Sequence, residues 1–205
     1  MTYFSIKYIT GIKDLRSESY ERFIFTVKFF SKPSLPKLNL GCGDKLLPGY
    51  INVDTSPSRK GFVPDILADL RDLPFEPNSA DEVLAVHVIE HFYAWETKEL
   101  LMHWLNIIAP GGKIVLECPN LLTAAQTLVK DETLASDLSE KRGQHVMWPL
   151  YGDPGWADPL MCHRWGYTPK SLICLLEDCG YRHVRQEPAQ FKKRDPRDMR
   201  IVGIK

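Results

Sequence analysis

From Pro36 onward, short apolar runs alternate with segments of helical periodicity, and this alternation constrains the fold more than any other feature of the sequence. Such a pattern is typical of a parallel sheet that is covered by helices. A polar, proline-containing segment without helical pattern separates the last two runs, which favours an antiparallel pair there. The predicted strands are residues 37–40, 50–54, 65–70, 81–89, 113–118, 181–186 and 199–205.

Three segments carry apolar residues at helical spacing. Residues 97–109 end in a Pro-Gly-Gly turn, residues 121–140 form an amphipathic pattern, and residues 169–179 lie between a Thr-Pro start signal and Gly180. A long insertion spans residues 120–167, between the predicted strand 113–118 and the helical segment 169–179. Its second half is rich in Trp, Tyr, Pro and His. Loops of this length inside a compact domain are usually functional. We predict a lid or acceptor-binding segment, with a purely structural role as the alternative.

The composition is that of one globular domain with an extension. The chain has 205 residues, of which 44% are hydrophobic and 25% charged, and this is ordinary for a single core. We predict an N-terminal extension, residues 1–35, that packs on a core domain, residues 36–205. Residues 20–30 fit a helix over the main domain better than a strand, and a membrane-surface or dimer contact is the alternative.

Charge and cysteine usage narrow the class of partners and the compartment. With 26 basic and 26 acidic residues the net charge is zero, which argues against nucleic acid as the main partner. No apolar run approaches the roughly 18 residues that a membrane span needs. The five cysteines include no CxxC pair and no signal peptide is recognisable, so we expect a cytoplasmic protein, with a homodimer as an open alternative.

The segment LNLGCGD, residues 38–44, follows a predicted strand and contains two glycines. Glycines at the carboxyl end of a strand let a ligand approach the backbone. A dinucleotide fingerprint would need Gly or Ala where this chain has Leu46, and an acid about twenty residues on, whereas Asp54 comes earlier. The two strands are also too close in sequence for a full helix, whose N-terminus a pyrophosphate prefers. A ligand that has a carboxylate, an amine and a ribose but no phosphate fits better.

Polar side chains follow three successive strands. Asp54 ends the second strand, where a carboxylate can accept both hydroxyls of a ribose, and Asp69 ends the third, near the expected adenine amino group. His87, Glu90 and His91 lie at or just past the carboxyl end of the fourth strand. Histidine can accept a proton at neutral pH, so these three are candidate catalytic residues, with a structural role as the alternative. No metal site is expected, because His145, Cys162 and His163 lack paired-ligand spacing.

These motifs together resemble the class I S-adenosylmethionine (SAM) dependent methyltransferases, in a small subgroup similar to the type 11 methyltransferases. LNLGCGD is similar to the family's first motif, NVD to its second-strand acid, HVIEHF to the end of its fourth strand, and IIAPGGKIVLECPN to its PGG turn and fifth strand. The resemblance covers about residues 36–205. It implies a Rossmann-like three-layer α/β/α sandwich whose seven-stranded, mostly parallel sheet has the order 3-2-1-4-5-7-6, with strand 7 antiparallel.

The resemblance also implies SAM as the cofactor and a set of binding residues. The cofactor-binding candidates are Asn39, Gly41, Cys42, Gly43, Asp54, Asp69, Leu70 and His87, and the insertion supplies the acceptor candidates His145, Trp148, Tyr151 and His163. Asn39 and Lys45 stand where many members have an acid and a glycine, which predicts modest cofactor affinity. The expected reaction is methyl transfer to a small molecule, with a sugar or surface-glycan precursor as one candidate. A non-catalytic SAM-binding or partner-binding module is the alternative, and a nucleic-acid methyltransferase ranks third.

Overall fold

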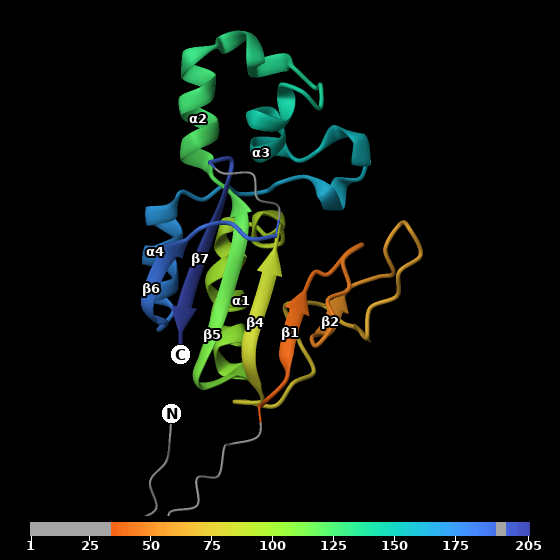
Figure 1. Cartoon of the computed structure of the whole chain (residues 1–205), viewed down its shortest axis with the longest axis vertical. Helices are drawn as coiled ribbons and strands as arrows, with labels where there is room; N and C mark the ends of the chain where they lie inside the picture. Colours follow the sequence, from red (N-terminus) through yellow and green to blue (C-terminus); the bar gives the residue numbers. More distant parts are fainter. Residues whose placement is uncertain (1–33, 192–195) are drawn as a thin grey trace, which may run out of the picture. The chain divides into compact units, whose positions relative to one another are not determined.

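A computed structural model describes residues 34–191 and 196–205 (Figure 1). The described residues belong almost entirely to one unit, Leu35–Lys205. The expectations for residues 1–33, including the helix around residues 20–30, lie outside the described part. Within that part, no helix has both the length and the apolar character needed to cross a membrane.

Seven strands form one sheet in the order β3-β2-β1-β4-β5-β7-β6. Neighbouring strands are parallel except for β7, which is antiparallel to both β5 and β6. The predicted order and the antiparallel final pair are therefore confirmed. The strands are β1 (Lys37–Leu40), β2 (Ile51–Asp54), β3 (Ile66–Leu67), β4 (Ala80–Val86), β5 (Ile108–Pro119), β6 (Arg182–Glu187) and β7 (Asp198–Ile204).

Two of the α-helices begin at recognisable capping residues. The side chain of Asn120 accepts hydrogen bonds from the backbone at the start of α2, and Thr168 forms a capping box with Ser171 at the start of α4. The α-helices are α1 (Ala94–Ile107), α2 (Leu121–Lys130), α3 (Met147–Tyr151) and α4 (Pro169–Asp178). The short 3-10 helices are η1 (Ile89–His91), η2 (Glu132–Ser136), η3 (Gly143–His145), η4 (Pro154–Trp156) and η5 (Pro159–Met161).

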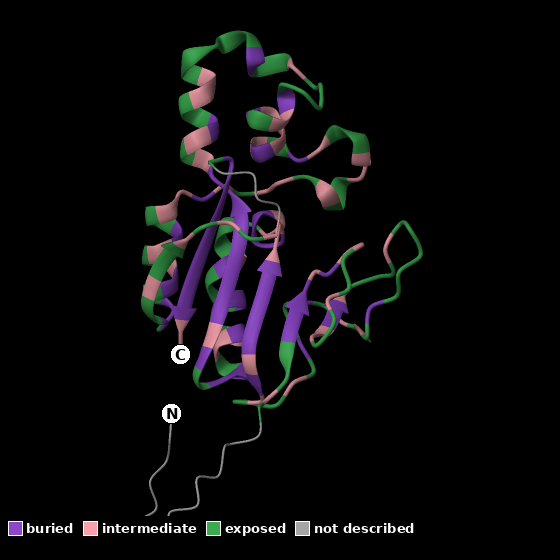
Figure 2. Cartoon of the chain, viewed as in Figure 1, coloured by how far each residue is buried: buried purple, intermediate pink, exposed green. Residues whose placement is uncertain are grey.

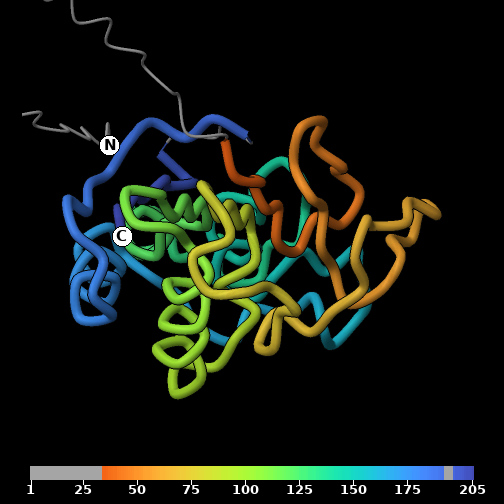
Figure 3. The backbone as a smooth tube through the Cα atoms, turned by 90° about the horizontal axis from the view of Figure 1, so that it is seen from below, coloured from red at the N-terminus to blue at the C-terminus, as the bar shows by residue number. Residues whose placement is uncertain are grey.

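The two faces of the sheet are covered differently. Strand residues whose side chains point to one face share a single large apolar cluster with α1 and α4. Figure 3 shows both helices on the same side of the strands. Residues that point to the other face form a small cluster of Leu84, Val115 and Val202. The described apolar residues packed against it are Leu47, Tyr50, Val86 and Phe191. The central strands are buried along most of their length (Figure 2). Burial on both faces explains their nearly continuous apolar sequence.

Several predicted boundaries are corrected by the structure. The strand predicted over 81–89 ends at Val86, and the chain turns at His87, whose φ is 55°. The predicted strand 65–70 keeps only two paired residues. The helix predicted over 121–140 ends at Lys130, because Asp131 leaves the helical conformation and caps η2.

The insertion is also more ordered than a loop. Its second half contains α3 and three 3-10 helices, two of which begin at Asp-Pro pairs whose aspartate side chain caps the turn. The insertion follows β5 and lies beyond the end toward which β4 and β5 point (Figure 1). Ligands of open α/β sheets bind beyond the carboxyl ends of strands. The insertion is therefore placed to border such a site.

One core contact connects the helical layer to this end of the sheet. Trp104 of α1 is fully buried, and its indole N–H donates to the carbonyl of Leu70 at 2.8 Å. We expect Trp104→Phe to lower the free energy of unfolding by about 1 to 3 kcal/mol, because the buried carbonyl loses its donor. Urea denaturation measures the change. Trp95→Phe, on the exposed side of the same helix (75% exposed), is the matched control and should stay within about 0.5 kcal/mol of the parent; equal effects would contradict the prediction.

Candidate functional site

The glycine loop after β1 is held against the end of β2. The backbone N–H groups of Gly41 and Cys42 both donate to the carbonyl of Val53, at 2.8 and 3.2 Å. The N–H of Gly43 donates to Oδ2 of Asp54 at 2.8 Å, and the N–H of Thr55 donates to Oδ1 at 2.7 Å. The loop and the strand-end carboxylate therefore form one hydrogen-bonded unit.

The two glycines have different reasons to lack a side chain. Both have positive φ, +64° at Gly41 and +49° at Gly43. A Cβ on Gly41 would lie 2.5 Å from Cγ2 of Val88, whereas a Cβ on Gly43 would meet nothing within 4 Å. A side chain at Gly41 would therefore collide with Val88, whereas one at Gly43 would project into open space, and both glycines line the cleft described below.

A buried polar network fixes the loop from below. The side-chain NH₂ of Asn39 donates to Oδ1 of Asn52 at 2.9 Å and to the carbonyl of Lys45 at 3.0 Å. Asn52 in turn donates its backbone N–H and its side-chain NH₂ to Oδ2 of Asp65, at 2.7 and 2.9 Å. These hydrogen bonds lower the pKa of Asp65. Asn39 therefore supports the loop as well as lining the cleft above it. Sequence reasoning missed its partner Asn52 and the Asp65 carboxylate that accepts from Asn52.

The carboxylate of Asp69 is already engaged by an arginine. Oδ2 of Asp69 lies 2.8 Å from a guanidinium nitrogen of Arg71, which also reaches Glu96 at 3.2 Å. Hydrogen bonds from the Arg71 side chain and backbone lower the pKa of Asp69. Since each carboxylate oxygen has more than one lone pair, Asp69 can still accept from a ligand, but Arg71 competes for it.

All of the predicted cofactor-binding residues line one cleft of about 830 Å³. The cleft extends from the glycine loop past Val86 and Val88 to the insertion, where Trp148, His163 and Arg164 border it. Small-molecule sites typically measure about 300 to 1,000 Å³. Cys42 also lines the cleft, and burial, followed by the charge of Asp54, raises the pKa of its thiol to about 11. The thiol is therefore protonated at neutral pH.

His87 lies between two carboxylates. Its Nδ1 is 3.1 Å from Oε1 of Glu90, and its Nε2 is 3.4 Å from Oδ2 of Asp198, which also pairs with Arg197 at 2.9 Å. Burial alone would lower the pKa of His87, but the contacts with Asp198 and Glu90 outweigh it and raise the pKa. Both ring nitrogens are thus occupied by acids within the protein.

The other two histidines of the region meet across the cleft wall. His91, from η1, and His163, from the insertion, pack edge to face with ring centroids 5.0 Å apart. Burial lowers the pKa of His163, which is therefore neutral at pH 7. Burial would raise the pKa of Glu90, but the surrounding His87, His91 and His163 rings hold it at about 2.

The four acceptor candidates of the insertion are not all at the cleft. Trp148 and His163 line it. Tyr151 lies instead with Trp148 around a neighbouring cavity of about 310 Å³, and His145 is exposed and lines neither. A contact that sequence reasoning missed connects the insertion to the loop after β2: Arg59 pairs with Asp158 at 3.0 Å and stacks on Trp156 at 5.0 Å.

The fold is a Rossmann-like α/β domain with a cleft at the carboxyl ends of its strands. Residues 38–116 match a family model described as a methyltransferase domain. The matched segment is therefore similar to a methyltransferase domain, and it contains the glycine loop, Asp54 and Asp69. A search of curated proteins gave no match.

Solved structures share this fold at low sequence identity. A SAM-dependent methyltransferase from Archaeoglobus fulgidus is similar with a TM-score of 0.56 and 18% identity, over 85% of this chain and 87% of that one. A SAM-dependent methyltransferase from Methanosarcina mazei is similar with a TM-score of 0.55 and 13% identity, over 85% of this chain and 94% of that one. A possible histamine N-methyltransferase from Thermotoga maritima has a TM-score of 0.51 and 13% identity, over 85% of this chain and 84% of that one. At these identities the likeness concerns the fold alone.

Proposed function

We propose that this chain transfers the methyl group of SAM to a small-molecule acceptor, with a sugar or surface-glycan precursor as the acceptor class. One observation carries the proposal: the glycine loop, the strand-end acids and the insertion line the same cleft. Donor and acceptor would therefore meet in one hollow. Holding two reactants in line can supply about 7 to 11 kcal/mol of the barrier, and methyl transfer needs little else from a protein.

The donor half of the cleft fits SAM. Gly43 offers backbone with no side chain in the way. The carboxylate of Asp54 is held by two backbone N–H groups, and its remaining lone pairs can accept the ribose hydroxyls. We propose that Asn39, Cys42, Asp69, Leu70 and His87 line the rest of this half. When bound, SAM supplies an electrophilic methyl group on a sulfonium.

The acceptor half combines aromatic faces with hydrogen-bonding groups, as a sugar ring requires. Phe92 and Trp148 line it together with His163 and Arg164. The indole N–H of Trp148 is buried and has no hydrogen-bond partner among the described residues. A buried donor without a partner costs free energy, so a hydroxyl oxygen of the acceptor is its natural partner.

An acceptor hydroxyl must also lose its proton. Of the sequence-predicted candidates, His87 is flanked by Glu90 and Asp198, and we propose that it positions Glu90 rather than taking the proton. His91 and His163 line the cleft. We therefore propose that His91, His163 and Glu90 together form the part of the site that acts on the acceptor hydroxyl.

The proposal is tested by incubating the protein with SAM and a panel of sugars and nucleotide sugars, and measuring S-adenosylhomocysteine and methylated product by mass spectrometry. Thermal shift with SAM and with NAD tests the donor half separately; stabilisation by SAM alone is expected. Trp148→Phe keeps the ring but removes the N–H, and should raise the KM for the acceptor about 5- to 30-fold without changing the SAM-induced shift. A protein that ignores SAM, or responds only to NAD, would refute the proposal.

A further inference from the structure

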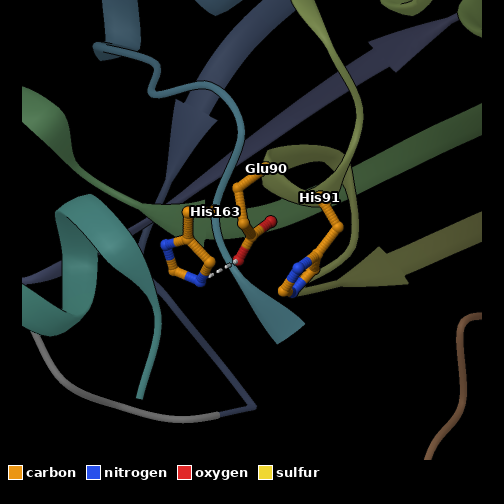
Figure 4. A group of neighbouring side chains, drawn as sticks. All are labelled: Glu90, His91 and His163. Carbon is orange, nitrogen blue, oxygen red and sulfur yellow. Dashed lines mark ion pairs between the residues drawn. The ribbon is translucent and has the colours of Figure 1, made fainter. Parts of the chain in front are cut away.

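Three side chains converge at the wall of the cleft, apart from the glycine loop and the strand-end acids. Glu90 and His91 come from η1, and His163 comes from the insertion. One donor atom of each lies within 4.8 Å of the others (Figure 4). Nε2 of His163 is 3.9 Å from Oε1 of Glu90, which lies between the two rings.

Backbone carbonyls fix the tautomer of both imidazoles. Nδ1 of His91 lies 3.2 Å from the carbonyl oxygen of Cys162, and Nδ1 of His163 lies 2.9 Å from that of Pro149. A carbonyl can only accept, so in each ring Nδ1 donates, and in the neutral ring Nε2 keeps a lone pair. Histidines that bind metals typically donate their other N–H to such a carbonyl.

The carboxylate of Glu90 is paired through Oε1 alone, and its Oε2 has no hydrogen-bond partner among the described residues. Glu90 is only 2% exposed, yet neither of its oxygens accepts a well-aligned hydrogen bond from the described residues. The nearest group, Nδ1 of His87, makes an ion-pair contact at 3.1 Å. A buried carboxylate oxygen without a partner is costly, so Oε2 remains available to coordinate a metal ion.

We propose that Glu90, His91 and His163 bind a divalent transition-metal ion of the zinc type. Two imidazole nitrogens and one carboxylate oxygen suit Zn²⁺ and its neighbours, whereas Mg²⁺ and Ca²⁺ prefer oxygen ligands. Metal–donor distances of about 2.0 to 2.2 Å require these atoms to move closer together on binding. Three protein ligands leave a fourth position open, and His91 and His163 border the cleft.

The use of this ion rests on the proposed function. A hydroxyl of the acceptor would fill the open position, where the ion lowers its pKa and the proton passes to solvent. The new O–CH₃ bond then forms as the S–CH₃ bond of SAM breaks, and the sulfonium becomes a neutral thioether.

The test uses the full, untagged chain, freed of metal with a chelator and titrated with Zn²⁺ by calorimetry. One equivalent per chain is expected. Changes to residues that merely support metal ligands typically cost 10- to 100-fold in affinity, so His163→Asn and Glu90→Gln, which remove ligands, should each cost at least about 100-fold. Cys162→Ser and His145→Asn are matched controls in the same insertion and should leave the affinity unchanged.

Two results would overturn the inference: no stoichiometric zinc uptake by the parent chain, or parent-like affinity in both His163→Asn and Glu90→Gln. Loss of binding in Cys162→Ser would assign the zinc to the thiol instead. Melting curves without metal show that each variant is folded. Thermal shift with SAM on the same samples separates the two proposals, because a chain that responds to SAM but binds no zinc refutes the metal site alone.

Discussion

Gly41→Ala is expected to lower the free energy of unfolding by about 2 to 5 kcal/mol. A non-glycine residue in the left-handed region costs roughly 1 to 2 kcal/mol. Gly41 has φ +64°, and a Cβ there would lie 2.5 and 3.2 Å from the two methyl groups of Val88. Val88 is 6% exposed and packs in the main core cluster, so it cannot move aside freely, and overpacking adds about 1 to 3 kcal/mol.

Gly43→Ala is the matched control for this prediction. Gly43 also has positive φ, but its Cβ would meet no atom within 4 Å, so only the backbone cost of about 1 to 2 kcal/mol is expected. Urea denaturation measures both variants. In a Val88→Ala background the methyl groups are gone, and Gly41→Ala should then cost no more than Gly43→Ala does. Equal costs for the two glycine variants in the parent chain would show that Val88 yields without strain.

The sheet was largely predictable from the sequence, because its strands are buried and its turns carry strong local signals. The runs around β1, β2, β4 and β5 overlap the predicted strands, although β4 ends at Val86 and β5 begins already at Ile108. The strand order came from the family resemblance, since no local pattern states which strands are neighbours. The length of β3, which has two residues, was overestimated. Its pairing depends on β2 rather than on the apolar content of β3 itself.

The convergence of the predicted cofactor-binding residues on one cleft was predictable for a topological reason. Parallel strands bring their carboxyl ends to one edge, so residues after β1, β2 and β4 had to converge. What faces each residue was not predictable: the contact of Gly41 with Val88 and the arginine on Asp69 depend on the packed structure.

The acceptor half depends on contacts distant in sequence. His163 lies more than seventy positions after Glu90, yet its ring approaches that carboxylate to 3.9 Å. No spacing rule could have linked the two, and the sequence predicted His163 only as an acceptor residue, rejecting a metal site with His145 and Cys162. The contact of the insertion with the loop after β2 also joins residues remote in sequence, because Arg59 and its partner Asp158 are 99 positions apart.

Asp54→Ala is expected to weaken SAM binding by roughly 10- to 150-fold, which corresponds to the 1.5 to 3 kcal/mol of a charge-assisted hydrogen bond. The structure adds a second effect. The carboxylate accepts the N–H groups of Gly43 and Thr55 at 2.8 and 2.7 Å, so its removal also frees the glycine loop from β2. The unliganded protein should therefore lose about 1 to 3 kcal/mol of stability as well.

Asp54→Asn separates the two effects, because the amide keeps one oxygen acceptor and the shape of the side chain while it loses the charge and one acceptor. We expect this variant to retain more of the loop's stability than Asp54→Ala and still to bind SAM more weakly than the parent. Calorimetric titration with SAM and urea denaturation measure the two quantities. If Asp54→Ala bound SAM as tightly as the parent while losing stability, the carboxylate would serve only to hold the loop, and the ribose would have to be bound elsewhere in the cleft.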